Sequence, residues 1–106
     1  MLLLTPRQAV RRAASILEDH GLEEVARSAD SESVYLRGLG SVARLRVSTH
    51  RRTPGRRRQY PDVAHSLVFR DPKSERQVRT MAEAALTAFL RASRAGETSS
   101  PISRDC

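Results

Sequence analysis

Arginine side chains are concentrated in one part of this chain. Between Ser33 and Pro61 there are eight arginines and not one aspartate or glutamate. A guanidinium group is a planar fork of donors that can bond to phosphate or carboxylate through two hydrogen bonds at once. The arginines of this basic block are Arg37, Arg44, Arg46, Arg51, Arg52, Arg56, Arg57 and Arg58. The block predicts a surface that binds an anionic partner, either nucleic-acid phosphates or an acidic protein surface.

The basic block accounts for the charge of the whole protein. The chain has 19 lysines and arginines against 12 acids, a formal net charge of +7. Because eight of these cations lie in the block, the rest of the chain is close to neutral. A solvated surface that only keeps the protein soluble is the alternative interpretation. Clustered like charges repel one another, which favours a surface that meets a partner.

Side chains within and beside the block could add to binding or to chemistry. His50 follows a predicted strand and could act as a general base on a phosphodiester, or simply extend the basic surface. Tyr60 could stack on an exposed base. His20 and His65 are scattered, and no spacing of His, Cys or carboxylates is typical of a metal site. Without a nucleophile motif or a phosphate-binding glycine loop, we expect a binding module, not an enzyme, with no metal or cofactor.

The elements that must position these residues begin with a helix. Thr5, Pro6 and Gln8 predict a capped helix over residues 6–20, and Gly21 is a suitable end for it. Residues 22–29 are compatible with a helix or a strand, and we favour a strand.

A β-hairpin is predicted at the start of the basic block. Residues 33–37 and 42–48 have the composition and alternation of two paired strands. In the second strand, apolar side chains alternate with polar ones. The apolar set is Ala43, Leu45 and Val47, and the polar set is Arg44, Arg46 and Ser48. The two sets are expected on opposite faces of the sheet.

The rest of the block is predicted to be a loop. Residues 49–62 have no apolar periodicity and contain Pro54, Gly55 and Pro61. A further strand is predicted at residues 66–69.

The C-terminal part predicts a second helix. Asp71 and Pro72 suit its start, and an apolar stripe extends it over residues 73–93, so that it ends before Gly96. Residues 97–106 are predicted to be a disordered tail.

Together these elements predict an α+β fold with one domain over residues 1–96. A small antiparallel sheet of three to four strands would have the N- and C-terminal helices packed on one face. The opposite face would then carry Arg44 and Arg46 beside the basic loop. A domain of this size is marginally stable alone, so a homodimer is one expectation.

Composition also bears on where the protein works. The one cysteine, Cys106, cannot form an intramolecular disulfide, which suits the cytoplasm. The apolar start at residues 1–4 is too short for a signal peptide, and no stretch approaches the roughly 20 apolar residues of a membrane helix. We therefore expect a cytoplasmic protein with no membrane partner.

The order of the predicted elements resembles two known families. A helix, the strands Val25-Ala26-Arg27-Ser28 and Val34-Tyr35-Leu36, a third strand and a closing helix are similar to the plan of double-stranded-RNA-binding domains. The small toxin ribonucleases of the HicA family share this plan. Their catalytic histidine follows a Gly-Ser in the first hairpin, where this chain has Asp30-Ser31-Glu32-Ser33. A HicA-like ribonuclease, with His50 as its base, is therefore the least favoured function.

A second resemblance covers residues 34–51. Tyr-Leu-Arg, a glycine turn and Leu-Arg-Val-Ser-Thr-His-Arg resemble a segment of small uncharacterised phage and prophage proteins. This resemblance implies a phage accessory protein, and many of these inhibit host nucleoprotein complexes such as CRISPR effectors. The sequence thus favours a non-catalytic module that binds nucleic acid or a nucleoprotein complex through its Arg-rich strand and loop. An anti-CRISPR-like inhibitor that acts by protein–protein contact is the alternative.

Overall fold

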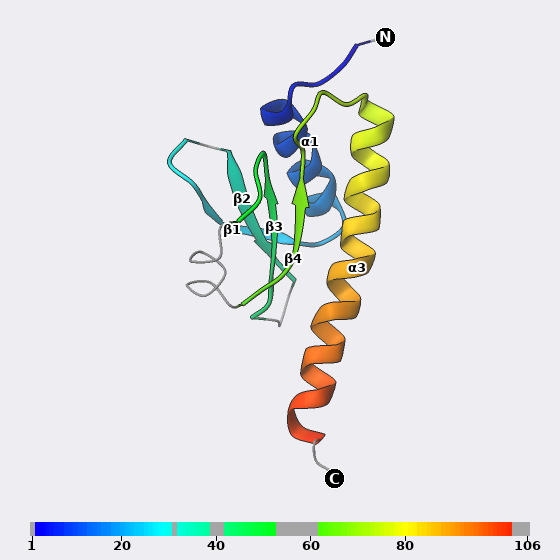
Figure 1. The fold of residues 1–106 in the computed structure, drawn as a ribbon. Helices are drawn as coiled ribbons and strands as arrows, with labels where there is room; N and C mark the ends of the chain where they lie inside the picture. Colours follow the sequence, from blue (N-terminus) through cyan, green and yellow to red (C-terminus); the bar gives the residue numbers. More distant parts are fainter. Residues whose placement is uncertain (1, 31, 39–41, 53–61, 103–106) are drawn as a thin grey trace.

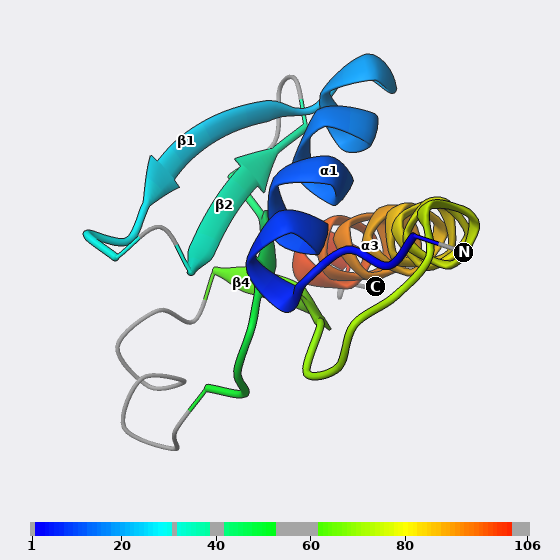
Figure 2. The ribbon, with the colours of Figure 1, turned by 90° about the horizontal axis from the view of Figure 1, so that it is seen from above.

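Two helices and a four-stranded sheet make up the described part of the protein. The computed structural model describes residues 2–30, 32–38, 42–52 and 62–102, with side chains described as far as residue 93. Along the chain the elements are α1 (Pro6–Asp19), β1 (Glu23–Arg27), β2 (Ser33–Arg37), β3 (Arg44–Ser48), β4 (Val63–Val68) and α3 (Glu75–Ile102). Both helices lie on the same face of the sheet (Figures 1 and 2). The predicted α+β fold, with its terminal helices on one face, is confirmed.

The strands lie in the order β1-β2-β3-β4. The β1–β2 and β2–β3 pairs are antiparallel, and the latter places Tyr35 opposite Arg46, which confirms the predicted hairpin. The β3–β4 pair is parallel, with Arg46 opposite Ser66. The expectation of a wholly antiparallel sheet is therefore wrong for this pair. The long connection between β3 and β4 is the reason, because it has the dozen or more residues that a return to the start of the neighbouring strand requires.

Local signals set the bounds of α1. The Thr5 hydroxyl accepts a hydrogen bond from the Gln8 amide, while the Gln8 side chain accepts one from the Thr5 amide. This reciprocal cap satisfies two amides that have no partner within the helix. Beyond the helix, Gly21 has a φ of 99°, a conformation that glycine adopts without strain. The predicted start and end of this helix are confirmed.

The predicted bounds of the second helix are wrong at both ends. Lys73 and Leu4 exchange two backbone hydrogen bonds, which hold the chain extended after Pro72. The helix is instead capped by Ser74, whose hydroxyl accepts from the Gln77 amide. At the other end the helix passes Gly96, because a glycine weakens a helix by only about 1 kcal/mol and does not by itself end it. The domain boundary at residue 96 and the tail stay predictions.

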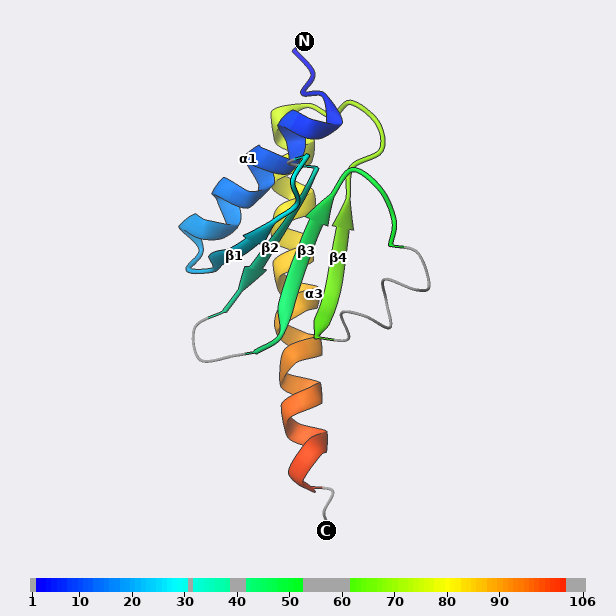
Figure 3. The same ribbon diagram turned by 90° about the vertical axis from the view of Figure 1, so that its left-hand side faces the viewer.

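Alternation along β2 and β3 separates a core face from an open face. Val34 and Leu36 of β2, with Leu45 and Val47 of β3, are fully buried beneath the helices. α3 contributes the predicted stripe, in which Val78, Ala82, Ala85 and Phe89 are buried. The polar residues of β3 consequently lie on the face that Figure 3 turns toward the viewer, with α3 behind the sheet.

Within the described part of the chain, no helix is both long and apolar enough to cross a lipid bilayer.

Candidate functional site

A pocket of about 200 Å³ lies on the open face of the sheet. The turn between β1 and β2 forms one side, β2 and β3 contribute the sheet, and the segment that follows β3 forms the other side. Its described lining consists of Ser28, Asp30, Ser33, Tyr35, Arg46, His50, Arg51 and Arg52. The pocket thus unites three arginines of the basic block with hydroxyl groups and one carboxylate.

Arg46 is the central cation of this pocket. Strand alternation turns it away from Leu45 and Val47, and the antiparallel register sets it opposite Tyr35. Only 2% of Arg46 is exposed, although it stands on the face away from the helices. Its Nη2 donates a hydrogen bond of 3.1 Å to Ser48 Oγ. Such contacts hold a buried guanidinium in one orientation. The charge of Arg46 therefore has a defined position beside the pocket.

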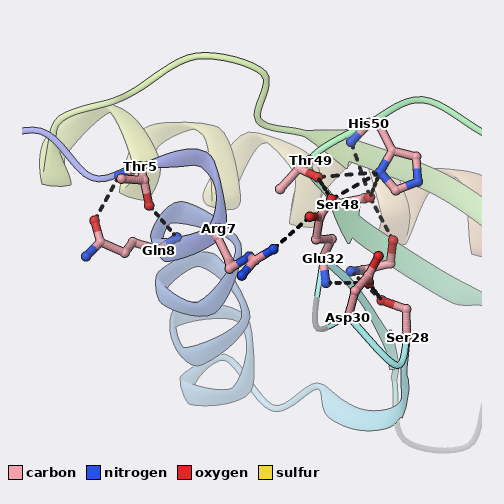
Figure 4. A network of polar contacts seen from close by, with 10 residues as sticks. Thr5, Arg7, Gln8, Ser28, Asp30, Glu32, Ser48, Thr49 and His50 are labelled. Atoms are coloured by element: carbon pink, nitrogen blue, oxygen red, sulfur yellow. Dashed lines mark hydrogen bonds and ion pairs between the residues drawn. The ribbon is translucent and has the colours of Figure 1, made fainter.

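Ser48 links the two sides of the pocket. Its fully buried Oγ lies 2.8 Å from Ser33 Oγ across the strand pair. It also accepts a hydrogen bond of 3.3 Å from the backbone amide of His50. Figure 4 shows Ser48, Thr49 and His50 close together at the end of β3. Ser48 therefore contacts both the Arg46 guanidinium and the start of the segment that leads to Arg51 and Arg52.

Two carboxylates lie at the β1–β2 turn, and both are held ionised. The Ser28 hydroxyl and the Glu32 amide donate to Asp30 Oδ1 at 2.7 and 3.0 Å, and these bonds lower the pKa of Asp30. Hydrogen bonds from Arg7 and Thr49, both 2.8 Å long, lower the pKa of Glu32. Glu32 thereby joins α1 to the end of β3, as Figure 4 shows.

His50 is at the rim of the pocket. Its Nδ1 faces the β3 end, 3.5 Å from Ser48 Oγ, 3.4 Å from Thr49 Oγ1 and 3.9 Å from Glu32 Oε1. Its side chain is 58% exposed. When protonated, His50 adds a fourth cation to the pocket.

The arginines predicted to act as one surface fall into separate groups. Arg46, Arg51 and Arg52 come together with His50 at the pocket. Arg37 and Arg44 lie opposite each other at the far end of the hairpin.

Each of these two arginines faces a carboxylate. Arg44 Nε is 2.7 Å from Asp62 Oδ2, and Arg37 Nη2 is 3.7 Å from Glu23 Oε1. Their positive charge is thus partly balanced within the protein. The remaining predicted site residues, Arg56, Arg57, Arg58 and Tyr60, lie outside the described residues.

A second hollow of about 360 Å³ adjoins the first along β4. It shares Arg51 and Arg52 with the first pocket, and its described lining adds Val63, Ala64, His65, Ser66 and Val68. Arg51 is exposed and Arg52 is partly buried, so both can meet a partner that lies across the two hollows.

Several residues of the pocket were not singled out from the sequence. Tyr35 and Ser33 have a signal, because alternation with the apolar Val34 and Leu36 places them on the open face. Asp30 and Ser28 have no such signal in the sequence, because their position at the pocket depends on the conformation of the β1–β2 turn.

The described lining of the pocket consists mainly of guanidinium and hydroxyl groups. Among the residues that the structure describes, no three His, Cys, Asp or Glu side chains are grouped so that they could hold a metal ion. The pocket instead offers guanidinium and hydroxyl donors, which suit an oxyanion. No protein-family model, curated protein or solved structure matches this chain.

Proposed function

We propose that this protein binds nucleic acid, without chemical turnover, through the open face of its sheet. The observation that supports this most directly is the meeting of Arg46, Arg51 and Arg52 at one pocket whose described lining has a single carboxylate. Phosphates are the anions that a dense group of arginines binds best, because each guanidinium fork can bond to two phosphate oxygens. Counterions released from the nucleic acid add to the affinity.

The form of the surface favours nucleic acid over an acidic protein. A stable protein interface buries about 800 Å² on each partner and has a well-packed apolar centre. The open face instead has two hollows that adjoin at Arg51 and Arg52. Polar side chains line the first, and the second mixes polar side chains with Val63, Ala64 and Val68. Such hollows can receive phosphates and sugars in succession. An inhibitor that docks on a host protein complex remains the competing hypothesis, and the binding experiment below distinguishes the two.

The proposal assigns no catalytic step to His50. General acid–base cleavage of a phosphodiester requires both a proton acceptor and a proton donor at the reacting atoms. His50 is the one histidine in the described lining of the first pocket, and its Nδ1 faces Ser48, Thr49 and Glu32. A basic contact to phosphate is the simpler role for it.

The test is the salt dependence of oligonucleotide binding. We expect the protein to raise the fluorescence anisotropy of a labelled single-stranded DNA or RNA, with affinity falling steeply as salt rises. The double variant Arg51→Ala, Arg52→Ala should bind about tenfold or more weakly at low salt, because it can no longer form two charge-assisted pairs with phosphate. Its slope of log affinity against log salt should fall by about 1.4, since each phosphate that a protein neutralises on a single strand contributes roughly 0.7.

A matched control removes two arginines from the helical layer. Arg11 and Arg76 are exposed on α1 and α3, on the other side of the sheet from the pocket. The double variant Arg11→Ala, Arg76→Ala changes the net charge equally and should bind almost as the wild type does. Equal weakening in both double variants would contradict the proposal, because it would mean that only net charge matters. Salt-insensitive binding would equally contradict it.

A further inference from the structure

We propose that the 200 Å³ pocket receives a terminal phosphomonoester of a nucleic-acid strand, in preference to an internal phosphodiester. This inference rests on the proposed function, which needs only that phosphates meet the open face. It adds that one phosphate enters the pocket and that this phosphate stands at the end of a strand.

Size and access are the first argument. Pockets that enclose whole drug-sized ligands measure roughly 300–1,000 Å³. A pocket of about 200 Å³ therefore suits a single group, not a whole nucleotide. Arg46 lines it but is only 2% exposed, so a ligand meets this guanidinium only by entering. An internal phosphodiester has a sugar on each side and must lie along the surface, where Arg51 and Arg52 are within reach. A terminal phosphate has one ester bond and can project inward.

Charge is the second argument. The described lining has three guanidinium cations and one carboxylate, an excess of two positive charges when His50 is neutral. Asp30 stays ionised within this balance, because hydrogen bonds from Ser28 and from the Glu32 amide lower its pKa. A phosphomonoester has a charge of about −1.5 to −2 near pH 7. An internal phosphodiester or a carboxylate has a single negative charge and would leave the pocket positively charged.

The hydroxyl network supplies the third argument. A serine hydroxyl has one hydrogen to donate and two lone pairs that accept. Ser48 Oγ accepts from Arg46 Nη2 and from the His50 amide, which uses both of its lone pairs. Its own hydrogen then has two acceptors within reach, Ser33 Oγ at 2.8 Å and His50 Nδ1 at 3.5 Å, and the shorter contact with Ser33 is the better one. Ser33 Oγ then accepts from Ser48, which leaves the Ser33 hydrogen available to the pocket that Ser33 lines. Ser28 differs, because its hydrogen is donated to Asp30. The Ser33 hydroxyl is thus a neutral hydrogen-bond donor that lines the pocket together with the guanidinium groups.

The experiment compares oligonucleotides that differ only at their ends. One single-stranded sequence with an internal fluorophore is prepared with a 5′-phosphate, with a 3′-phosphate, or with hydroxyls at both ends. A fourth oligonucleotide has hydroxyl ends and two extra nucleotides, so that its charge matches that of the phosphorylated ones. At a fixed salt concentration, we expect one or both phosphorylated strands to bind the wild-type protein about tenfold tighter than the charge-matched strand.

Variants locate the preference in the pocket. Arg46→Lys keeps the charge but removes the fork, so it should reduce the end preference to less than about threefold. Should Arg46→Lys fail to fold by circular dichroism, Ser33→Ala replaces it, with the same expected loss of preference. The exposed Ser15 of α1 provides the control, since Ser15→Ala should keep the full preference.

The outcomes separate this inference from the proposed function. Equal affinities for the phosphorylated and charge-matched strands would overturn the inference, while loss of binding in the Arg51→Ala, Arg52→Ala protein would still support the proposed function. Binding of a free nucleoside monophosphate as tightly as the phosphorylated strand would overturn the assignment to a strand end. If no oligonucleotide binds even at low salt, both proposals are wrong.

Discussion

Ser33 Oγ lies 2.8 Å from Ser48 Oγ across the β2–β3 pair, and this hydrogen bond joins the acidic β1–β2 turn to Arg46. On one side, the Ser33 amide donates to Ser28 Oγ, which in turn donates to Asp30. On the other side, Arg46 donates to Ser48. A carboxylate and a buried guanidinium are therefore held in fixed positions by a chain of short polar side chains, and the pocket lies above that chain.

Replacing Ser48 by alanine tests the importance of this hydrogen-bonded chain for stability. Ser48→Ala removes the acceptor of the buried Arg46 Nη2 and of the partly buried His50 amide, and losing the acceptor of a buried donor costs about 1–3 kcal/mol. We expect the free energy of unfolding to fall by an amount in this range, measured by urea denaturation. Ser15→Ala, on the exposed side of α1, should change it by less than about 0.5 kcal/mol. A Ser48→Ala protein as stable as this control would show that Ser48 contributes little.

Acid should destabilise the protein through the β1–β2 turn. The pKa of Glu32 lies below its ordinary value of 4.5 and that of Asp30 below 3.8, because both accept hydrogen bonds in the folded state. A carboxyl group with a depressed pKa stabilises the fold above its unfolded pKa, and this contribution is lost as the pH falls through its folded pKa. Stability should therefore decrease as the pH is lowered below about 4.5.

Glu32→Gln isolates one part of this dependence. The variant lacks the titrating group, so its stability should fall less steeply than that of the wild type as the pH is lowered below about 4.5, measured by thermal unfolding at a series of pH values. Ser15→Ala, on the exposed side of α1, changes no titrating group and should follow the wild-type slope. Identical slopes for Glu32→Gln and the wild type would contradict the link between Glu32 and acid stability.

Arginines at the two ends of the hairpin should differ in their effect on binding. Arg37 and Arg44 face Glu23 and Asp62, so removing them takes away charge that is already partly balanced. We expect Arg37→Ala, Arg44→Ala to weaken oligonucleotide binding by less than about threefold, against about tenfold or more for the Arg51 and Arg52 pair. Fluorescence anisotropy at one salt concentration measures both. A larger loss at the Arg37 and Arg44 end would place the binding surface at that end.

Much of the local structure could be predicted because it depends on neighbours along the chain. The cap formed by Thr5 and Gln8, and the positive φ at Gly21, are short-range features with characteristic residues. Alternation in β3 depends only on the two-residue period of a strand, which put Arg46 on the face opposite Leu45. Fold class followed from the order of these elements.

Other features depend on residues that are far apart in sequence. The second helix begins at Glu75 because Lys73 pairs with Leu4, near the other end of the chain. The direction of β4 depends on the path of a long connection, and no local pattern specifies it.

By itself, the sequence determined that Arg44 and Arg46 would share one face of a small α+β sheet and that Arg51 and Arg52 would follow them along the chain. Only the tertiary structure decided which of them share a pocket. In the folded protein Arg44 forms an ion pair with Asp62, while Arg46, Arg51 and Arg52 line one pocket together with Asp30. The physical reason is that periodicity is a property of the backbone of each strand. By contrast, the pairing of charges depends on strand register and turn geometry, which long-range packing fixes.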